Sequence, residues 1–251
     1  MSKVFRVEKV DPGKLTREDR QTISKKLYAI HEAVFSGLDE DEFDHYVVNS
    51  PAKDTKLYVY RNKQGEVVGY FGVHCFEKSV EHHPLVIFRA EVGLLHGYRQ
   101  SNANLSYWLL EAAKFKLLHP KKRAYFLYAP VSPSFYAMVA KYTYQVYPKY
   151  NQTIPAHIQA LMIQLAQQFG LEQVNESNPL VKKVGWVTKV KPHETEYWRC
   201  CSNPHIKFYI DKNPNFTKGC GLLTIIPLTF LNLALSLPAI LFHELKKKFR
   251  S

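Results

Sequence analysis

The sequence contains few cysteines, and their spacing matches no structural cysteine motif. There are 4 cysteines in 251 residues, which is too few for a disulfide scaffold, and none has the C-x-x-C spacing of a zinc site. The first residues also lack the apolar stretch of about 7–15 residues found in a secretory signal peptide. These absences exclude the small secreted disulfide-rich class, and we expect a reducing, cytoplasmic location.

Glycine and proline occur only in ordinary numbers. The chain has 11 glycines and 14 prolines, which excludes collagen-like sequences and low-complexity disorder. Hydrophobic residues make up 46% and charged residues 22% of the sequence. A chain of this length and composition can bury a substantial core and accommodates one domain with an appendage.

Acidic residues are scarce relative to basic ones. The 34 Lys and Arg exceed the 22 Asp and Glu, which gives a formal net charge of +12. Such a surplus favours a polyanionic partner: a nucleic acid, an anionic lipid or a phosphorylated cofactor. The sequence has no recognised nucleic-acid motif and no dense basic patch interleaved with aromatic residues, so we expect no nucleic-acid partner.

Apolar periodicity predicts one α+β domain with a mixed sheet and no internal repeat. Helical spacing of apolar residues predicts helices, and β-rich runs between turn residues predict strands. The expected helices are 16–35, 39–48, 104–118, 132–142 and 153–169, and the expected strands are 56–61, 66–76, 85–98, 123–129, 185–190 and 205–210. Gly93 and Gly97 interrupt the long third strand, where we expect a β-bulge.

The connection between the strand 85–98 and the next helix has the composition of an anion site. The first N–H groups of a helix have no partner within the helix and attract phosphate. Arg99, Ser101, Asn102 and Asn104 would add further donors around this turn. We expect a phosphate-bearing ligand here; the alternative is a plain connection with a solvent-exposed arginine.

The order of these elements resembles the GNAT superfamily of N-acyltransferases over residues 15–145. The resemblance rests on the hairpin ending in GEVVGYFGV, the strand AEVGLLHGYR, and the helix, strand and helix that follow. It implies a central, mostly antiparallel sheet flanked by helices. It also places Glu91 on the family's fourth strand and residues 99–104 at its pyrophosphate loop.

The loop departs from the family pattern in a way that bears on the donor. The family sequence Arg-x-x-Gly-x-Gly/Ala is replaced by Arg99-Gln-Ser-Asn102-Ala-Asn104. The asparagine side chains would crowd the pyrophosphate of coenzyme A. Branches of the superfamily that take long acyl chains from acyl carrier protein, such as acyl-homoserine-lactone and N-acyl-amino-acid synthases, also deviate here. The resemblance therefore implies an acyl-CoA or acyl-ACP co-substrate, and no metal.

Attack of an amine on a thioester needs a base for the amine proton, donors to the developing oxyanion, and an acid for the leaving thiolate. Glu91 is the first candidate for the base because it is the one carboxylate in an otherwise apolar strand. Its alternative role is a structural ion pair with Arg89 or Arg99. His96 is the second candidate for the base, since its ordinary pKa suits proton transfer.

The remaining roles come from the resemblance. It implies that backbone N–H groups near Leu94 and Leu95 polarise the thioester carbonyl. It also implies that a tyrosine on the helix after the fifth strand protonates the thiolate. Tyr136 is the first choice for this acid and Tyr142 the second.

Residues 219–242 carry no charge, whereas lysines and an arginine flank them on both sides. Pro227, Asn232 and Pro238 interrupt the apolar run, and positive residues favour the cytoplasmic face at both ends. We therefore expect a helix–break–helix that dips into one leaflet or lies at the membrane interface. A buried core helix pair or a dimer interface is the alternative.

The sequence thus predicts an acyltransferase domain, residues 1–218, and a membrane-associating segment with a basic tail, residues 219–251. The expected function is transfer of an acyl group from acyl-CoA or acyl carrier protein to an amine. The protein would attach peripherally, or by a re-entrant segment, to the inner face of an anionic membrane. Two alternatives remain open: a soluble GNAT acetyltransferase using acetyl-CoA, and a non-catalytic GNAT-like protein that binds lipid or an acyl chain.

Overall fold

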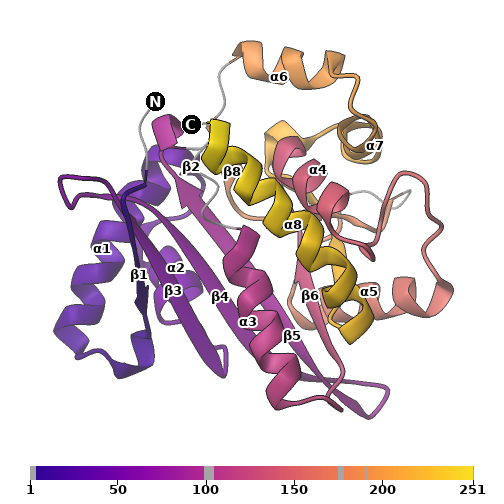
Figure 1. The fold of residues 1–251 in the computed structure, drawn as a ribbon, viewed down its shortest axis with the longest axis horizontal. Coiled ribbons are helices and arrows are strands. Elements are labelled where there is room, and N and C mark those ends of the chain that lie inside the picture. Colours follow the sequence, from indigo (N-terminus) through magenta and orange to yellow (C-terminus); the bar gives the residue numbers. More distant parts are fainter. Residues whose placement is uncertain (1–3, 99–104, 175–177, 190–191, 251) are drawn as a thin grey trace.

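A computed structural model describes residues 4–98, 105–174, 178–189 and 192–250 of the chain, and its centre is a six-stranded mixed sheet (Figure 1). The sheet order is β1-β3-β4-β5-β6-β10, and only β5 and β6 are parallel neighbours. The strands are β1 (Arg6–Val10), β3 (Asp54–Arg61), β4 (Val67–Val80), β5 (His83–Leu94), β6 (Ala124–Tyr128) and β10 (Thr224–Pro227). This mostly antiparallel sheet flanked by helices confirms the predicted fold class.

Helices cover both faces of the sheet. One face carries α1 (Arg17–Val34), α2 (Glu40–Phe43) and the π-helical turn η2 (Asp44–Val48), whose apolar side chains pack on β3 and β4. The other face carries α3 (Leu105–Leu118) and α8 (Phe230–Arg250), which lie side by side in front of the sheet in Figure 1. Both faces of the sheet are therefore covered by helices.

The remaining elements lie beyond β6 or form short connections. The helices are α4 (Pro133–Tyr142), α5 (Ala156–Gln168), α6 (Pro192–Cys200) and α7 (Pro204–Lys212). Two small antiparallel pairs join β2 (Phe35–Ser36) to β8 (Val187–Thr188) and β7 (Val181–Lys183) to β9 (Cys220–Leu222). Three short 3-10 turns complete the list: η1 (Pro12–Lys14), η3 (His96–Tyr98) and η4 (Phe216–Lys218).

Local sequence signals account for the first elements. Thr16 caps α1, its hydroxyl accepting from the Asp19 N–H at 3.1 Å. In the turn between β3 and β4, the Asn62 side chain accepts from the backbone N–H groups of residues 64 and 66. Gly65 takes a φ of +82° in this turn, which favours glycine. The predicted first helix and hairpin are confirmed.

The predicted β-bulge in the third long strand is wrong. The register between β4 and β5 runs without a shift from Val80–His83 to Gly69–Leu94, and the strand ends there. Gly93 is needed for a different reason: Tyr70 lies opposite on β4, and a Cβ at Gly93 would overlap its ring. A glycine within a strand can thus mark a close approach of a neighbouring side chain, with no change in pairing.

Residues 205–210, predicted as a strand, lie instead in helix α7. The Asn203 side chain accepts from the His205 N–H at 3.0 Å, and Pro204 occupies the first turn. Both features are typical of a helix N-terminus. The two buried apolar residues, Ile206 and Tyr209, are three positions apart and so lie on one helical face.

The predicted helix–break–helix over residues 219–242 is wrong in its first half. Residues 220–228 are buried; they form β9 and β10, and β10 pairs with β6 at the edge of the central sheet. The second half is helical. Asn232, expected to interrupt the segment, docks α8 instead: it accepts from the Gln145 N–H at 2.8 Å and donates to the carbonyl oxygens of Gln145 and Pro227.

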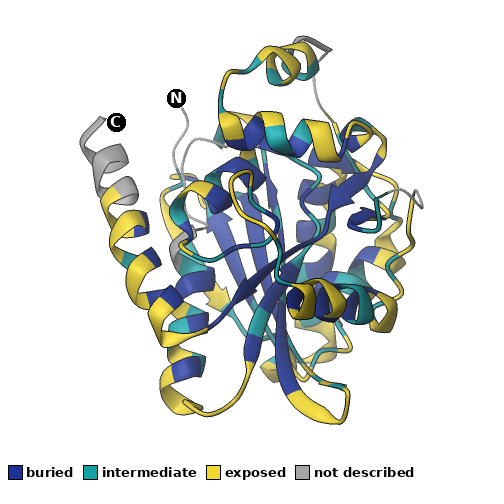
Figure 2. Cartoon of the chain, turned by 90° about the vertical axis from the view of Figure 1, so that its right-hand side faces the viewer, coloured by how far each residue is buried: buried dark blue, intermediate teal, exposed yellow. Residues whose placement is uncertain are grey.

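The outward side of α8 is exposed, as Figure 2 shows for the helix that ends at the C-terminus. Phe230, Leu231, Leu235, Leu241 and Phe242 are each about half exposed or more. Within the described ranges, none of the helices combines the length and the apolar character needed to cross a membrane. The exposed large apolar side chains of residues 219–242 all lie on α8.

Candidate active site

The neighbouring strands β5 and β6 separate near the middle of the sheet. They are paired only from Val86–Ala124 to Phe88–Phe126. A cavity of about 400 Å³ lies where they part, lined by β5 from Arg89 onward and by the chain that follows Phe126. Its wall is largely apolar and aromatic, including Phe35, Leu94, Trp108, Phe135, Met138, Trp186 and Trp198.

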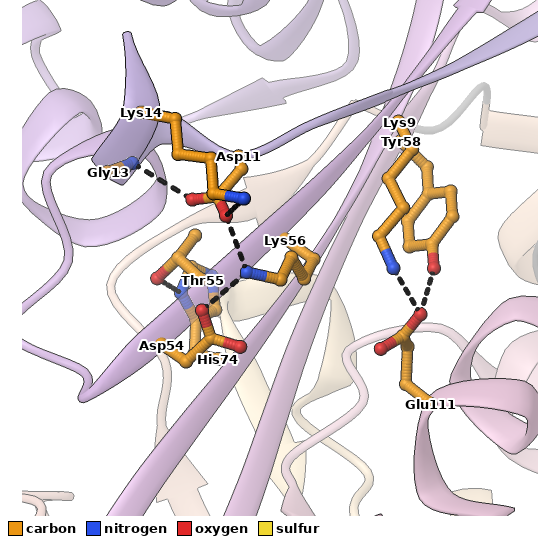
Figure 3. Close-up of polar contacts among 10 residues, drawn as sticks. All are labelled: Lys9, Asp11, Gly13, Lys14, Asp54, Thr55, Lys56, Tyr58, His74 and Glu111. Carbon is orange, nitrogen blue, oxygen red and sulfur yellow. Dashed lines mark hydrogen bonds and ion pairs between the residues drawn. The ribbon is translucent and has the colours of Figure 1, made fainter. Parts of the chain in front are cut away.

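Two carboxylates line this cavity, Glu91 and Glu194, and the structure pairs Glu91 with a histidine. The residue is 9% exposed, and its Oε2 lies 2.7 Å from Nε2 of His74 on β4. Nδ1 of His74 lies 3.0 Å from the Thr55 hydroxyl on β3, a contact drawn in Figure 3. Since a carboxylate can only accept, Nε2 carries the hydrogen in this contact when Glu91 is ionised. The three side chains form one chain of hydrogen bonds across three strands.

A glycine makes room for this pair. Gly72 lies directly opposite Glu91 in the β4–β5 register. A Cβ at this position would lie 3.0 Å from Glu91 Oε2 and 3.1 Å from His74 Nε2. The missing side chain therefore lets the carboxylate and the imidazole meet over the sheet.

One histidine lines the cavity, His31 on α1. Nδ1 of His31 lies 2.9 Å from the Tyr70 hydroxyl, and His31 is 3% exposed. Burial lowers the pKa of His31 to about 4, so the imidazole is neutral at neutral pH. Its Nε2 has no hydrogen-bond partner among the described residues. Burial, assisted by the negative charge of Glu91, raises the pKa of Tyr70 well above its ordinary value.

The two N–H groups predicted to bind the oxyanion, those of Leu94 and Leu95, point to opposite edges of β5. The Leu95 N–H donates to the Val68 carbonyl at 3.0 Å and is used by the sheet. Successive backbone groups of a strand point to opposite edges, so the Leu94 N–H points to the edge that β6 has left. Leu94 also lines the cavity. The geometry is compatible with a donor role for Leu94 but not for Leu95.

Neither the predicted second base nor the predicted acid is among the residues that line the cavity. His96 is in η3, with its side chain 55% exposed and its Nε2 3.3 Å from Glu194. Tyr136 is fully buried in α4, and its hydroxyl donates to the Pro148 carbonyl at 2.8 Å. Burial raises the pKa of Tyr136. The structure thus brings neither residue together with Glu91.

Sequence reasoning missed Tyr128. This residue ends β6 and lines the cavity, and its buried hydroxyl has no hydrogen-bond partner in the part of the chain that the structure describes. Burial raises its pKa well above the ordinary value. The only signal in the sequence is that Tyr128 lies near the end of a predicted strand. With 16 tyrosines in the chain, this position does not single it out.

The predicted phosphate-binding residues Arg99, Ser101, Asn102 and Asn104 lie outside the described residues. The structure therefore leaves this prediction untested. Among the described residues, no group of three or more His, Cys, Asp or Glu side chains is arranged to hold a metal ion.

No protein-family model matches this chain, and no curated protein matches it. Solved structures do match. A GCN5-related N-acetyltransferase from Kribbella flavida is 9% identical, over 88% of this chain and 97% of that one, with a TM-score of 0.35. An acetyltransferase from Trypanosoma brucei is 15% identical, over 53% of this chain and 91% of that one, with a TM-score of 0.33.

The spermidine/spermine N-acetyltransferase SpeG from Vibrio cholerae is 14% identical, over 54% of this chain and 76% of that one, with a TM-score of 0.30. The proteins named are N-acetyltransferases or acetyltransferases. Identities and scores of this size do not transfer an activity. The strand order, the separation of β5 from β6 and the buried Glu91 are features of this chain itself and do not depend on these comparisons.

Proposed function

We propose that this protein is an N-acyltransferase that moves an acyl group from a thioester to an amine. The observation that carries the proposal is the buried Glu91 carboxylate, paired with His74, in the wall of an apolar cavity opened by the separation of β5 and β6. A thioester and an amine that meet in this cavity would be shielded from water and would have a base beside them.

The reaction is the aminolysis of a thioester, and side-chain and backbone groups of the cavity can serve each of its steps. The amine nitrogen forms a C–N bond with the thioester carbonyl carbon, the C–S bond breaks, and the products are an amide and a thiol. Glu91 takes the proton that the nitrogen loses, and the Leu94 N–H faces the developing oxyanion. Tyr128 replaces Tyr136 as the acid for the thiolate in this proposal, because Tyr128 lines the cavity and its hydroxyl lacks a partner among the described residues.

The lining of the cavity favours a donor with a chain longer than acetyl. Aromatic and aliphatic side chains dominate the wall, and burial of a methylene group contributes about 0.8 kcal/mol. Acyl-CoA and acyl carrier protein present the acyl chain in the same way, so both remain donors in this proposal. The donor loop lies outside the described residues and does not discriminate between them.

We extend the proposal to attachment at an anionic membrane surface through the outer face of α8. This face exposes Leu231, Leu235, Leu241 and Phe242, while Leu233 and Ile240 are buried on the inner face. After Phe242 the sequence continues as HELKKKFRS. An amphipathic helix with a basic end is suited to the interface of a membrane that contains anionic lipids.

The test is thioester turnover by the full-length protein with decanoyl-CoA, acetyl-CoA and acyl carrier protein charged with decanoate. Release of free thiol and the mass of the amide product are measured with a panel of amines. We expect transfer, with decanoyl donors preferred over acetyl-CoA. Glu91→Gln should lower kcat by about 10²–10⁴-fold with little change in donor affinity.

Glu18→Gln is the matched control, because Glu18 is an exposed carboxylate at the start of α1, on the surface of the helix. An unchanged rate in Glu91→Gln would remove Glu91 as the base. Donor binding without any turnover would favour the non-catalytic acyl-binding alternative.

A further inference from the structure

A second cavity of about 390 Å³ lies beside Glu91, between η2, β4, β5 and the end of α5. Three residues, Tyr46, Arg89 and Glu91, line both this cavity and the first one. The two cavities therefore meet at the carboxylate. Both walls are mostly apolar, and the charged or titratable side chains of the second are His45, His74, Lys78, Arg89 and Glu91.

Two cations in the second cavity lack an acidic partner. Arg89 donates from Nη2 to the Tyr46 hydroxyl at 2.6 Å, and its guanidinium carbon lies 4.8 Å from the centre of the Phe169 ring. Nζ of Lys78 lies 4.6 Å from the centre of the same ring. In the described ranges, neither cation has a carboxylate within ion-pair distance.

The one carboxylate of this cavity, Glu91, is already engaged by His74. Two half-buried positive charges contact the same aromatic ring, and an anion that entered this cavity would offset their charge. Planar guanidinium groups also bind carboxylate and phosphate groups well. The second cavity thus has the groups to hold an anion at one end and a base at the other.

We propose that the second cavity is the acceptor site and that the acceptor is an amine which also carries an anionic group. Its amine would approach Glu91, while its carboxylate or phosphate would bind Arg89 and Lys78. The proposal rests on the N-acyltransferase function proposed above. It excludes polycationic amines as preferred acceptors, because these would bring more positive charge to Arg89 and Lys78.

Matched acceptors test this directly with the full-length protein and decanoyl-CoA. Leucine and leucinamide differ only in the carboxylate, and phosphoethanolamine and ethanolamine differ only in the phosphate. We expect a KM about 10- to 100-fold lower for the anionic member of one pair, since a charge-assisted contact is worth that factor. The pair that shows the larger ratio identifies the anion as a carboxylate or a phosphate.

Lys78→Gln keeps most of the side chain and removes its charge. It should raise the KM for the anionic acceptor about tenfold and leave the KM for decanoyl-CoA unchanged. Lys63→Gln is the control, because Lys63 is an exposed lysine in the turn between β3 and β4. Equal KM values within both pairs, or a Lys78→Gln effect on the donor instead, would overturn the proposal.

A protein that transfers acyl groups to neutral or cationic amines as readily as to anionic ones would keep the proposed function and refute the acceptor class. If no amine is acylated, the proposed function fails, and calorimetric binding of leucine against leucinamide decides the acceptor site separately. Binding of leucine that is lost in Lys78→Gln would support the site, and equal or absent binding of the two would refute it.

Discussion

Gly72 lies opposite Glu91 on the neighbouring strand, and its missing side chain is what allows Glu91 and His74 to touch. Gly72→Ala would place a Cβ 3.0 Å from the carboxylate and 3.1 Å from the imidazole, so that one of them has to shift by a few tenths of an ångström. Small displacements of catalytic groups are costly, and we expect kcat to fall about 3- to 10-fold while the KM for the donor stays unchanged.

Steady-state kinetics of Gly72→Ala beside Gly13→Ala measure this effect. At Gly13 an added Cβ would meet only the Asp11 carboxylate at 3.4 Å, an ordinary contact. A thermal melt should show both variants folded. Unchanged kinetics in Gly72→Ala would mean that the Glu91–His74 contact does not contribute to turnover.

His31 gives the protein a titratable group that is neutral when folded. Its pKa is lowered by burial to about 4, against about 6.5 in the unfolded chain. Between these values the unfolded state binds the proton and the native state does not, so stability falls as the pH falls through this window. From pH 7 to pH 4.5 this one group should remove about 2 kcal/mol from the free energy of unfolding.

Urea unfolding of the wild type and His31→Gln at both pH values measures that contribution. Other groups titrate in both proteins, so the quantity of interest is the difference between them. We expect this difference to shift by about 2 kcal/mol in favour of the variant on going to pH 4.5. A difference that does not change with pH would show that His31 is not the group responsible.

At the scale of elements, the C-terminal residues divide into a structural part and a peripheral part. β10 supplies an edge strand of the central sheet, and Leu223, Ile225 and Leu228, in this strand or beside it, are almost fully buried. Truncation after Lys218 removes these three side chains and four more buried ones, Leu222, Ile226, Leu233 and Ile240. At about 1.5–3 kcal/mol for each large apolar side chain, the total of about 10–20 kcal/mol is as large as the whole stability of a typical domain. We therefore expect no cooperative thermal transition in that truncated protein.

Truncation after Phe242 removes only the basic end of the chain. The docking contacts of Asn232 and Ser236 with residues 144 and 145 are kept. We expect a thermal transition close to that of the full chain. A cooperative melt after truncation at Lys218 would contradict the structural role assigned to β10.

The element predictions succeeded where a local signal was strong and failed where tertiary packing decided. Thr16, the turn from Asn62 to Gly65 and the heptad-like spacing of α1 are visible in the sequence. The uncharged run from residue 219 predicts a helix by its length. However, apolar residues without alternation suit a buried strand as well as a helix, so the pattern alone does not distinguish the two. Only its pairing with β6 resolves the choice.

At the scale of the whole molecule, a net positive charge is combined with exposed apolar side chains on two neighbouring helices, α3 and α8. The net charge is +12, and the outer faces of α3 and α8 expose Leu117, Leu118, Leu231 and Phe242. Exposed apolar groups beside a basic segment favour an anionic lipid surface. The chain shortened after Phe242 should therefore bind vesicles that contain phosphatidylglycerol more weakly than the full chain does.

Flotation with such vesicles, and with neutral phosphatidylcholine vesicles as the control, measures this binding at low and high salt. The full chain should float only with the anionic vesicles and should be released by salt. A full chain that never floats, and instead dimerises in solution, would assign the α8 face to a second copy of the protein.

The sequence by itself determined the α+β class, the early helix, the hairpin, and the position of Glu91 as the carboxylate of an otherwise apolar strand, because these depend on local periodicity and on one charge in an apolar strand. Only the tertiary structure decided what surrounds Glu91. His74, Thr55, Tyr128 and Arg89 come from different strands, and no spacing in the sequence links them to one another. The separation of β5 from β6, which creates the cavity, is likewise a property of strand pairing between distant segments. Distances of this kind are fixed when the sheet assembles, since each strand contributes its side chain to a face that it forms only together with its neighbours.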